Sequence, residues 1–89
     1  MVGEITELME TVEGMAGNYR ERFRAEYRQT KLRYEKLKDL NNRIEAAEAT
    51  NQKEPCHDCP AWMLKDQQHA MGEYLHILEV RAIIEEIEL

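Results

Sequence analysis

The sequence has few of the residues that interrupt helices or staple small folds. Its 89 residues include four glycines, two prolines and two cysteines. Two cysteines are too few for a disulfide scaffold, and so few glycines and prolines argue against a turn-rich β fold. No apolar run is long enough to cross a membrane, and no signal-like start or lipidation motif is visible, so we expect a cytoplasmic protein with no membrane contact.

Positive charge is scarce outside one window of the chain. The net charge is −6, yet nine of the twelve Lys and Arg fall between Arg20 and Arg43. Four acids in that window leave it at +5, and the rest of the chain is at −11. An acidic protein is not expected to bind DNA or RNA. The basic window could neutralise a small anion, or it could pair with acidic segments of a neighbouring subunit.

Apolar periodicity predicts a single all-α domain. Residues 4–16 predict a short amphipathic helix, followed by a hinge at Gly14 and Gly17. Asn18 then fits the N-cap of a long helix over residues 19–49. That helix carries a seam in steps of four and three, which is typical of helix pairing. The seam consists of Phe23, Tyr27, Thr30, Tyr34, Leu37, Asn41 and Ile44.

A loop and a third helix complete the predicted hairpin. Residues 50–60 hold both prolines, and Pro60 fits the first position of a helix over residues 61–88, with Asp58 or Cys59 as its cap. The two long helices are expected to pack antiparallel. The third helix has one apolar face, and neighbouring apolar residues widen that face. The face consists of Leu64, Met71, Leu75, Leu78 and Ala82, and Tyr74, Ile77, Ile84 and Ile87 widen it.

The third helix has more apolar surface than one neighbour can cover. A single packing partner covers an arc of roughly 100°. A lone hairpin would therefore leave part of the last turns in water, namely Val80, Ile83, Ile84 and Ile87. Each fully buried aliphatic side chain stabilises by about 1.5–3 kcal/mol, so we expect a homo-oligomer with a dimer as its smallest unit.

The loop contains Cys56-His57-Asp58-Cys59, which has part of a zinc-binding pattern. Two thiolates separated by two residues can chelate zinc, and His57 could add a ligand. A full site needs four ligands and no second pair is present, so Cys56 and Cys59 are candidates from an incomplete set. His69 and His76 could join only through geometry or dimerisation. The other interpretation is an ordinary loop, and no βαβ pattern supports redox chemistry.

Three arginines in the long helix form a ladder. Arg20, Arg24 and Arg28 are four residues apart and share one helix face, beside Phe23 and Tyr27. Guanidinium forks bind phosphate and aromatic faces stack on bases, so these are components of a nucleotide site. The alternative is a solvated face balanced by nearby acids or by an acidic helix of a neighbour.

A fourth arginine, Arg81, lies among apolar residues of the third helix. Such a guanidinium must be paired, reach to solvent or await a ligand, and Glu85 lies four residues on as a salt-bridge partner. Catalysis has little support, since the chain has no Ser/His/Asp arrangement, no glycine-rich phosphate loop and no His-Glu-x-x-His. We therefore expect neither an enzyme nor a cofactor.

Two patterns resemble a family of small phage proteins that form a helical hairpin, known from crAss-like and other phages. One pattern is Gln67-x3-Met71-x2-Tyr74-x3-Leu78-x2-Arg81. The other runs from Tyr19-Arg20-Glu21-Arg22 through Glu26-Tyr27 to Arg33-x2-Lys36-Leu37. The resemblance covers residues 19–84. The chain departs from the family in its Cys-His-Asp-Cys loop and in the short helix before the hairpin.

The resemblance implies a function in the infected host cell. Phage proteins of this size and shape include oligomeric sponges that sequester nucleotide signals of bacterial immunity, such as cyclic ADP-ribose variants and cyclic dinucleotides. It implies that Arg24 and Arg28, with Arg20 on the same face, hold phosphates and that Arg81 adds a cation. Tyr27 or Tyr74 would stack on the base, and Gln67 would read a base or ribose edge. Two alternatives stay open, a module that grips a host or phage protein and a small subunit with zinc in its loop.

Overall fold

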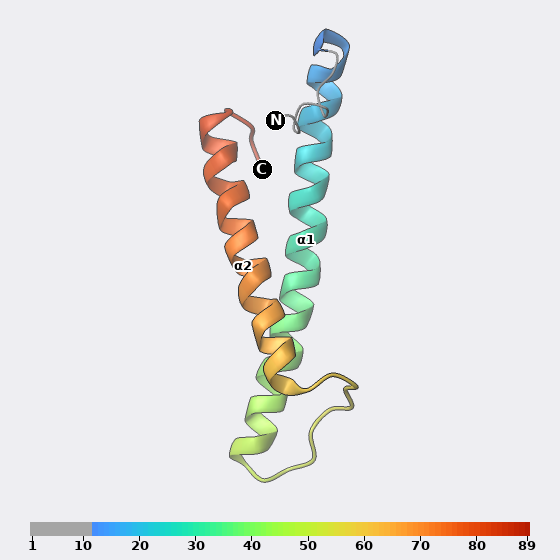
Figure 1. Cartoon of the computed structure of the whole chain (residues 1–89), viewed down its shortest axis with the longest axis vertical. Coiled ribbons are helices and arrows are strands. Elements are labelled where there is room, and N and C mark those ends of the chain that lie inside the picture. Colours follow the sequence, from blue (N-terminus) through green and yellow to red (C-terminus); the bar gives the residue numbers. More distant parts are fainter. Residues whose placement is uncertain (1–11) are drawn as a thin grey trace.

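A computed structural model describes residues 12–89, with side chains described from residue 18 onward. This part of the chain consists of two helices, α1 (Val12–Ala49) and α2 (Ala61–Ile84), which run antiparallel and are joined by a loop (Figure 1). They form a rod of 57 × 22 × 18 Å. The predicted all-α hairpin is confirmed.

The first helix begins earlier than the sequence predicted. We expected a hinge at Gly14 and Gly17 and a new helix from residue 19, but α1 is continuous from Val12. Asn18 therefore lies inside the helix and does not cap it. A glycine inside a helix costs about 1 kcal/mol relative to alanine, which a helix of 38 residues can absorb. Residues 4–11 of the predicted short helix lie outside the described residues.

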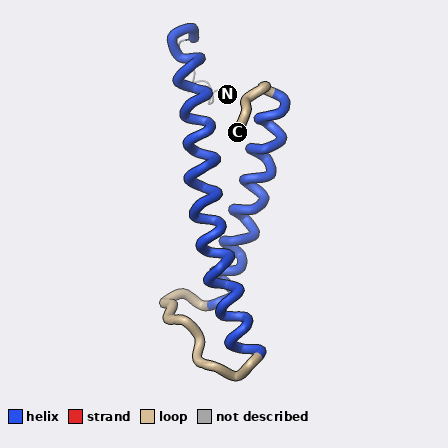
Figure 2. The backbone as a smooth tube through the Cα atoms, turned by 180° about the vertical axis from the view of Figure 1, so that it is seen from behind, coloured by secondary structure: helices blue, strands red, loops and turns tan. Residues whose placement is uncertain are grey.

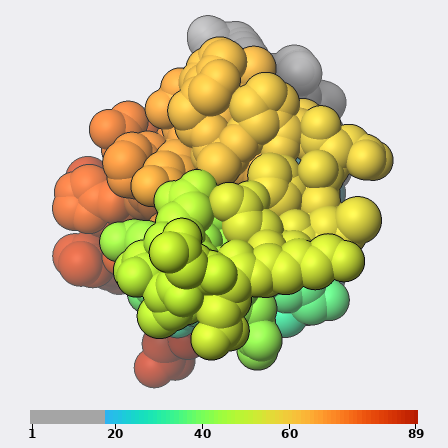
Figure 3. All heavy atoms as spheres, turned by 90° about the horizontal axis from the view of Figure 1, so that it is seen from below, coloured from blue at the N-terminus to red at the C-terminus, as the bar shows by residue number. Residues whose placement is uncertain are grey.

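The loop is fixed at both of its ends. α1 closes with Asn51 in the left-handed conformation (φ 59°), and the amide of Gln52 donates to the carbonyl of Ala47 at 2.8 Å. Pro60 occupies the N-cap position of α2, so the prediction of Asp58 or Cys59 as the cap is wrong. The Pro60 carbonyl itself accepts from two amides of the first turn. Figure 3 shows the loop spread over this end of the rod beside the start of α2.

The two helices pack through the predicted seam in one antiparallel register. Tyr34 of α1 lies against Gly72 of α2. Tyr27, seven residues before Tyr34, donates its hydroxyl to Glu79, which is seven residues after Gly72, as an antiparallel register requires. Gly72 allows this close approach, because a Cβ at this position would lie 3.3 Å from the Tyr34 ring and the ring would have to shift slightly. The buried residues of the seam and of the facing helix are Phe23, Thr30, Asn41, Ile44, Leu75, Leu78 and Ala82.

The outer face of α2 stays uncovered in the single chain. Val80, Ile83 and Ile84 are 42%, 78% and 72% exposed, as the width of the apolar arc predicted. Ile87 is the exception, because it is only 5% exposed. α2 ends at Ile84 and not at residue 88, and the chain then turns back toward α1 (Figures 1 and 2). The expectation that Ile87 is partly wet is therefore wrong.

Candidate functional site

The chain after α2 folds back as a short segment, residues 85–89, which we call the C-terminal strap. Its first turn is a Schellman turn, since Glu86 is left-handed (φ 57°) and the amide of Ile87 donates to the carbonyl of Ala82 at 2.8 Å. This turn carries Ile87 into the apolar cluster formed by Phe23, Leu78 and Ala82. The strap is thus anchored by one buried side chain.

Two arginines of the predicted ladder hold the strap by its backbone. Arg20 donates from Nη1 to the Glu86 carbonyl at 3.0 Å and from Nη2 to the Glu85 carbonyl at 3.3 Å. Arg24 donates from Nε to the Glu88 carbonyl at 2.7 Å. Glu85 is the C-cap of α2, and Glu86 and Glu88 lie beyond the helix, so these carbonyl oxygens are acceptors that need donors from outside α2. The ladder therefore meets an electronegative surface supplied by the chain itself.

Arg81 and Tyr19 tie the base of the strap to both helices. Arg81 Nε donates to Glu85 Oε2 at 3.0 Å and Nη2 donates to the Tyr19 hydroxyl, which in turn donates to Glu85 Oε1, both at 2.6 Å. The salt bridge to Glu85 is the pairing the sequence predicted. The guanidinium also stacks on the Phe23 ring at 5.0 Å, so its apolar surroundings are explained by packing.

These contacts shift the pKa values of Tyr19 and Arg81. Burial, followed by the hydrogen bond to Glu85, raises the pKa of Tyr19 above its ordinary value. Burial of Arg81 lowers its pKa, but the bonds to Glu85 and Tyr19 outweigh that effect and raise it. Arg81 therefore stays charged and Tyr19 stays neutral across the physiological range.

Tyr74 and Arg81 share a small hollow between the helices. It has a volume of about 220 Å³ and is also lined by Tyr19, Arg22 and Glu26. The Tyr74 hydroxyl donates to Glu26 Oε2 at 3.0 Å, and its pKa is raised by burial and then by that bond. Two cations and an aromatic ring at one hollow can hold an anionic group beside a planar one.

The remaining predicted ligand residues are spread along the rod. Tyr27 is engaged with Glu79, whose hydrogen bond raises the pKa of the Tyr27 hydroxyl to about 12. Arg28 is exposed on α1, one turn beyond Arg24. Gln67 is exposed near the start of α2 and faces the sulfur of Met71 at 4.0 Å. The arginines at one end thus lie together, whereas Gln67 does not join them.

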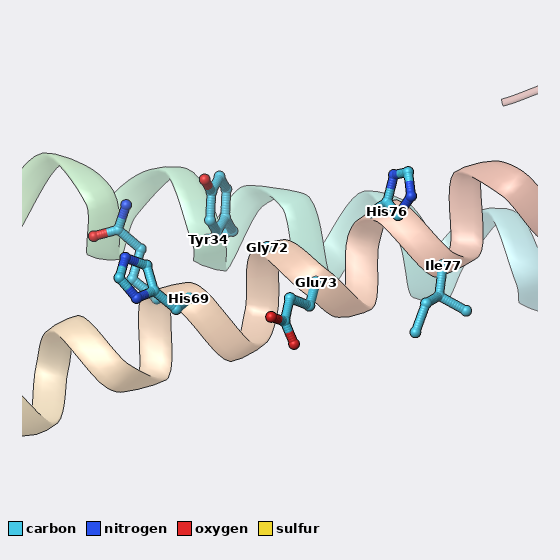
Figure 4. Close-up of a pocket in the computed structure, with 7 residues that line it drawn as sticks. Tyr34, His69, Gly72, Glu73, His76 and Ile77 are labelled. Atoms are coloured by element: carbon cyan, nitrogen blue, oxygen red, sulfur yellow. The ribbon is translucent and has the colours of Figure 1, made fainter.

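A further hollow lies around Gly72 and is lined by none of the residues that were predicted to bind the nucleotide. It has a volume of about 600 Å³, and Figure 4 shows the Tyr34 and His76 rings on one edge and Glu73 and Ile77 on the other. Sequence reasoning missed it, because its signal was one glycine in an unbroken helical pattern. His69 and Gln68 complete its wall.

The loop cysteines lie apart from this chemistry. Cys56 and Cys59 are free thiols exposed to solvent. Both nitrogens of His57 are engaged within the loop, Nδ1 with the Cys59 carbonyl at 2.6 Å and Nε2 with Glu54 at 3.1 Å. Residues 12–89 contain no group of three or more His, Cys, Asp or Glu arranged to hold a metal ion. Zinc in the loop is thus left without a complete ligand set within this part of one chain.

Comparisons with known proteins identify a family. A model of the Sequestin family matches residues 17–84, which is well over half of the chain. No curated protein and no solved structure matches it. Within the described residues, neither helix combines the length and apolar character that a membrane crossing requires.

Proposed function

The chain belongs to the Sequestin family, and from this membership and its arginine-rich end we propose that it binds and sequesters a small immune-signalling nucleotide without transforming it. The family name indicates sequestration of a molecule, which suits a binding protein rather than a catalyst. The ligand class is a cyclic ADP-ribose-type nucleotide or a cyclic dinucleotide. The setting is the cytoplasm of a bacterium infected by a phage.

One observation carries the proposal. Arg20 and Arg24 each direct guanidinium N–H groups at oxygen acceptors, so their forks already lie where phosphate oxygens can be held. Arg28 extends the same face by another turn, and Arg81 adds a cation across the hairpin. Tyr27 and Tyr74 are the aromatic candidates for stacking on a base, and Gln67 is proposed only as an outer contact.

A second copy of the chain is the proposed partner for the outer face of α2. Val80, Ile83 and Ile84 form an exposed apolar stripe beside the end that carries the arginines. Pairing two such stripes would bury aliphatic side chains worth about 1.5–3 kcal/mol each. It would also enclose the ligand between subunits, where water is excluded and charge pairing strengthens.

Isothermal titration against a panel of cyclic nucleotides tests the function. We expect heat with at least one ligand, and Arg24→Ala should weaken its binding about tenfold or more, the loss expected for a charge-assisted contact. Arg43→Ala is the matched control, because Arg43 lies on the same helix but is paired with Asp39 at 2.8 Å. No heat with any adenine-containing cyclic nucleotide, together with no effect of Arg24→Ala, would contradict the proposal.

The second candidate is a module that blocks a host or phage protein. The exposed apolar stripe of α2 favours it equally, since a foreign helix could cover the same side chains. A salt-sensitive complex with a host protein, formed without any nucleotide, would support this function over the first. Sedimentation of the isolated chain distinguishes a second copy from a foreign protein as the partner of the stripe, because a stable monomer at micromolar concentration leaves the stripe free for another protein.

A further inference from the structure

The C-terminal strap lies on the arginines that the proposed function assigns to the ligand. Its sequence is acidic, with Glu85, Glu86 and Glu88, and its carbonyl oxygens accept from Arg20 and Arg24. We propose that the strap is an internal stand-in for a ligand with two phosphate groups, and that a diphosphate-containing nucleotide displaces it. This inference rests on the proposed function for its ligand.

The arrangement of the acceptors indicates two phosphates. Arg20 holds two successive carbonyls with the two arms of its fork, at 3.0 and 3.3 Å, which is how a guanidinium holds two oxygens of one phosphate. Arg24 holds a separate oxygen at 2.7 Å. Since side chains four apart on a helix lie about 5–6 Å from each other at Cβ, a diphosphate can bridge the two forks. In the orientation that the strap imposes, the two forks hold separate oxygens, so a single phosphate could engage both only if the side chains moved.

The contacts of the strap are exchangeable for those of a ligand. Carbonyl oxygens are neutral acceptors, whereas phosphate oxygens form charge-assisted bonds that are roughly twice as strong. The side-chain triangle of Arg81, Tyr19 and Glu85 holds the base of the strap independently of these carbonyls. The strap can therefore open beyond Glu85 while α2 keeps its end.

The hinge of this motion is Glu86. It adopts φ 57°, a left-handed conformation that glycine and asparagine adopt readily and other residues only at a cost. The closed strap is thus held against local strain by the burial of Ile87 and by the two arginines. A glutamate at this hinge keeps the closed state less stable than a glycine would.

A first pair of variants tests displacement by changing the anchor. Ile87→Ser removes the buried side chain, and Leu89→Ser makes a similar change at an exposed residue of the same strap. If the closed strap limits binding, Ile87→Ser should bind pyrophosphate and ADP at least about tenfold more tightly than Leu89→Ser, because more molecules are open. Thermal unfolding of both variants confirms that the hairpin remains folded.

A second pair acts on the hinge and leaves the anchor in place. Glu86→Gly and Glu86→Ala remove the same charge, but only glycine relieves the left-handed strain. Glu86→Gly should therefore close the strap and bind pyrophosphate about fivefold more weakly than Glu86→Ala, the ratio expected from the glycine preference. Inorganic phosphate should bind more weakly than pyrophosphate to every variant, since it cannot span the two forks as they are oriented here.

The state of the strap can be observed without relying on affinity. In a ¹⁵N-labelled chain the Arg24 Nε–H signal should be protected from exchange, and saturating pyrophosphate should move the Ile87 amide toward its position in an open chain. Displacement of the strap is refuted if Ile87 stays buried in the saturated complex. It is also refuted if Ile87→Ser binds no more tightly than Leu89→Ser. If neither the native chain nor Ile87→Ser binds pyrophosphate or any nucleotide, the proposed function fails and displacement fails with it.

Discussion

Asn41 provides a stringent test of the packing between the helices. It is 3% exposed, and its Nδ2 donates to the Leu64 carbonyl at 3.1 Å and to Gln68 Oε1 at 2.9 Å. Asn41→Asp keeps the size of the side chain and replaces this donor by an oxygen. Acceptors then face acceptors in a buried site, so the change isolates hydrogen bonding from cavity formation.

The magnitude follows from these partners. Two hydrogen bonds of about 0.5–1.5 kcal/mol each are lost, and a buried acceptor left without a donor costs about 1–3 kcal/mol more. The Oδ1 of Asn41 already lacks a partner among the described residues, and the Leu64 carbonyl can only accept, so a carboxylate here can gain a donor only if the Gln68 amide turns over. We expect Asn41→Asp to lower the free energy of unfolding by about 3–5 kcal/mol near pH 7.

Urea unfolding followed by circular dichroism measures this change, with Asn42→Asp as the control. Asn42 is the exposed neighbour, and the same substitution there should stay within about 0.5 kcal/mol. Burial should raise the pKa of the carboxyl that Asn41→Asp introduces. The loss in free energy of unfolding is therefore small below the unfolded pKa of about 4 and grows as the pH rises through the folded pKa. If Asn41→Asp and Asn42→Asp lower the free energy of unfolding at pH 7 by amounts within about 1 kcal/mol of each other, the hydrogen-bond account of this position is refuted.

Three further predictions follow from individual contacts. In an NMR titration Tyr27 should ionise near pH 12, and Glu79→Gln should bring it back toward 10.0; the stability from this bond is complete below pH 10.0 and is lost as the pH rises through the folded value. His57 should titrate above 6.5, through its bond to the Cys59 carbonyl and then to Glu54, so this loop contact is complete below 6.5 and is lost at higher pH; an unchanged pKa in Glu54→Gln would argue against the second cause. Ile44→Ala should destabilise by about 2–5 kcal/mol in thermal unfolding, whereas Leu32→Ala, at an exposed residue, should have little effect.

The regular part of the fold could be predicted from the sequence because periodicity reports burial directly. Phe23, Thr30, Asn41 and Ile44 lie on the predicted seam and are buried. The start of α1 could not be predicted in the same way. Gly14 lowers helix propensity, but the cost of about 1 kcal/mol per glycine is small against the cooperativity of a long helix, so α1 continues through it.

The sequence indicated which residue types gather at the candidate site but not their arrangement, and their role in binding a ligand stays a prediction. Arginines four apart share a helix face whatever surrounds them, so the ladder was visible in the sequence. That Arg20 and Arg24 meet backbone oxygens was not visible, since a carbonyl leaves no mark in a sequence pattern. The hollow round Gly72 was missed for a similar reason, because its shape depends on Tyr34 from the other helix.

The strap shows why one apolar residue can serve two structures. Ile87 lies seven residues after Val80, so it continues the helical periodicity of α2. It is also the apolar residue that a Schellman turn places against the preceding helix, and periodicity cannot separate these roles. The Schellman turn is favoured over a continued helix for two reasons. Ending α2 at Ile84 buries Ile87, and Arg20 and Arg24 supply donors for three carbonyls of the strap. The arginines therefore hold the strap closed after α2 has ended, and a ligand that takes them frees the strap beyond Glu85 while Arg81 and Tyr19 keep the end of the helix in place.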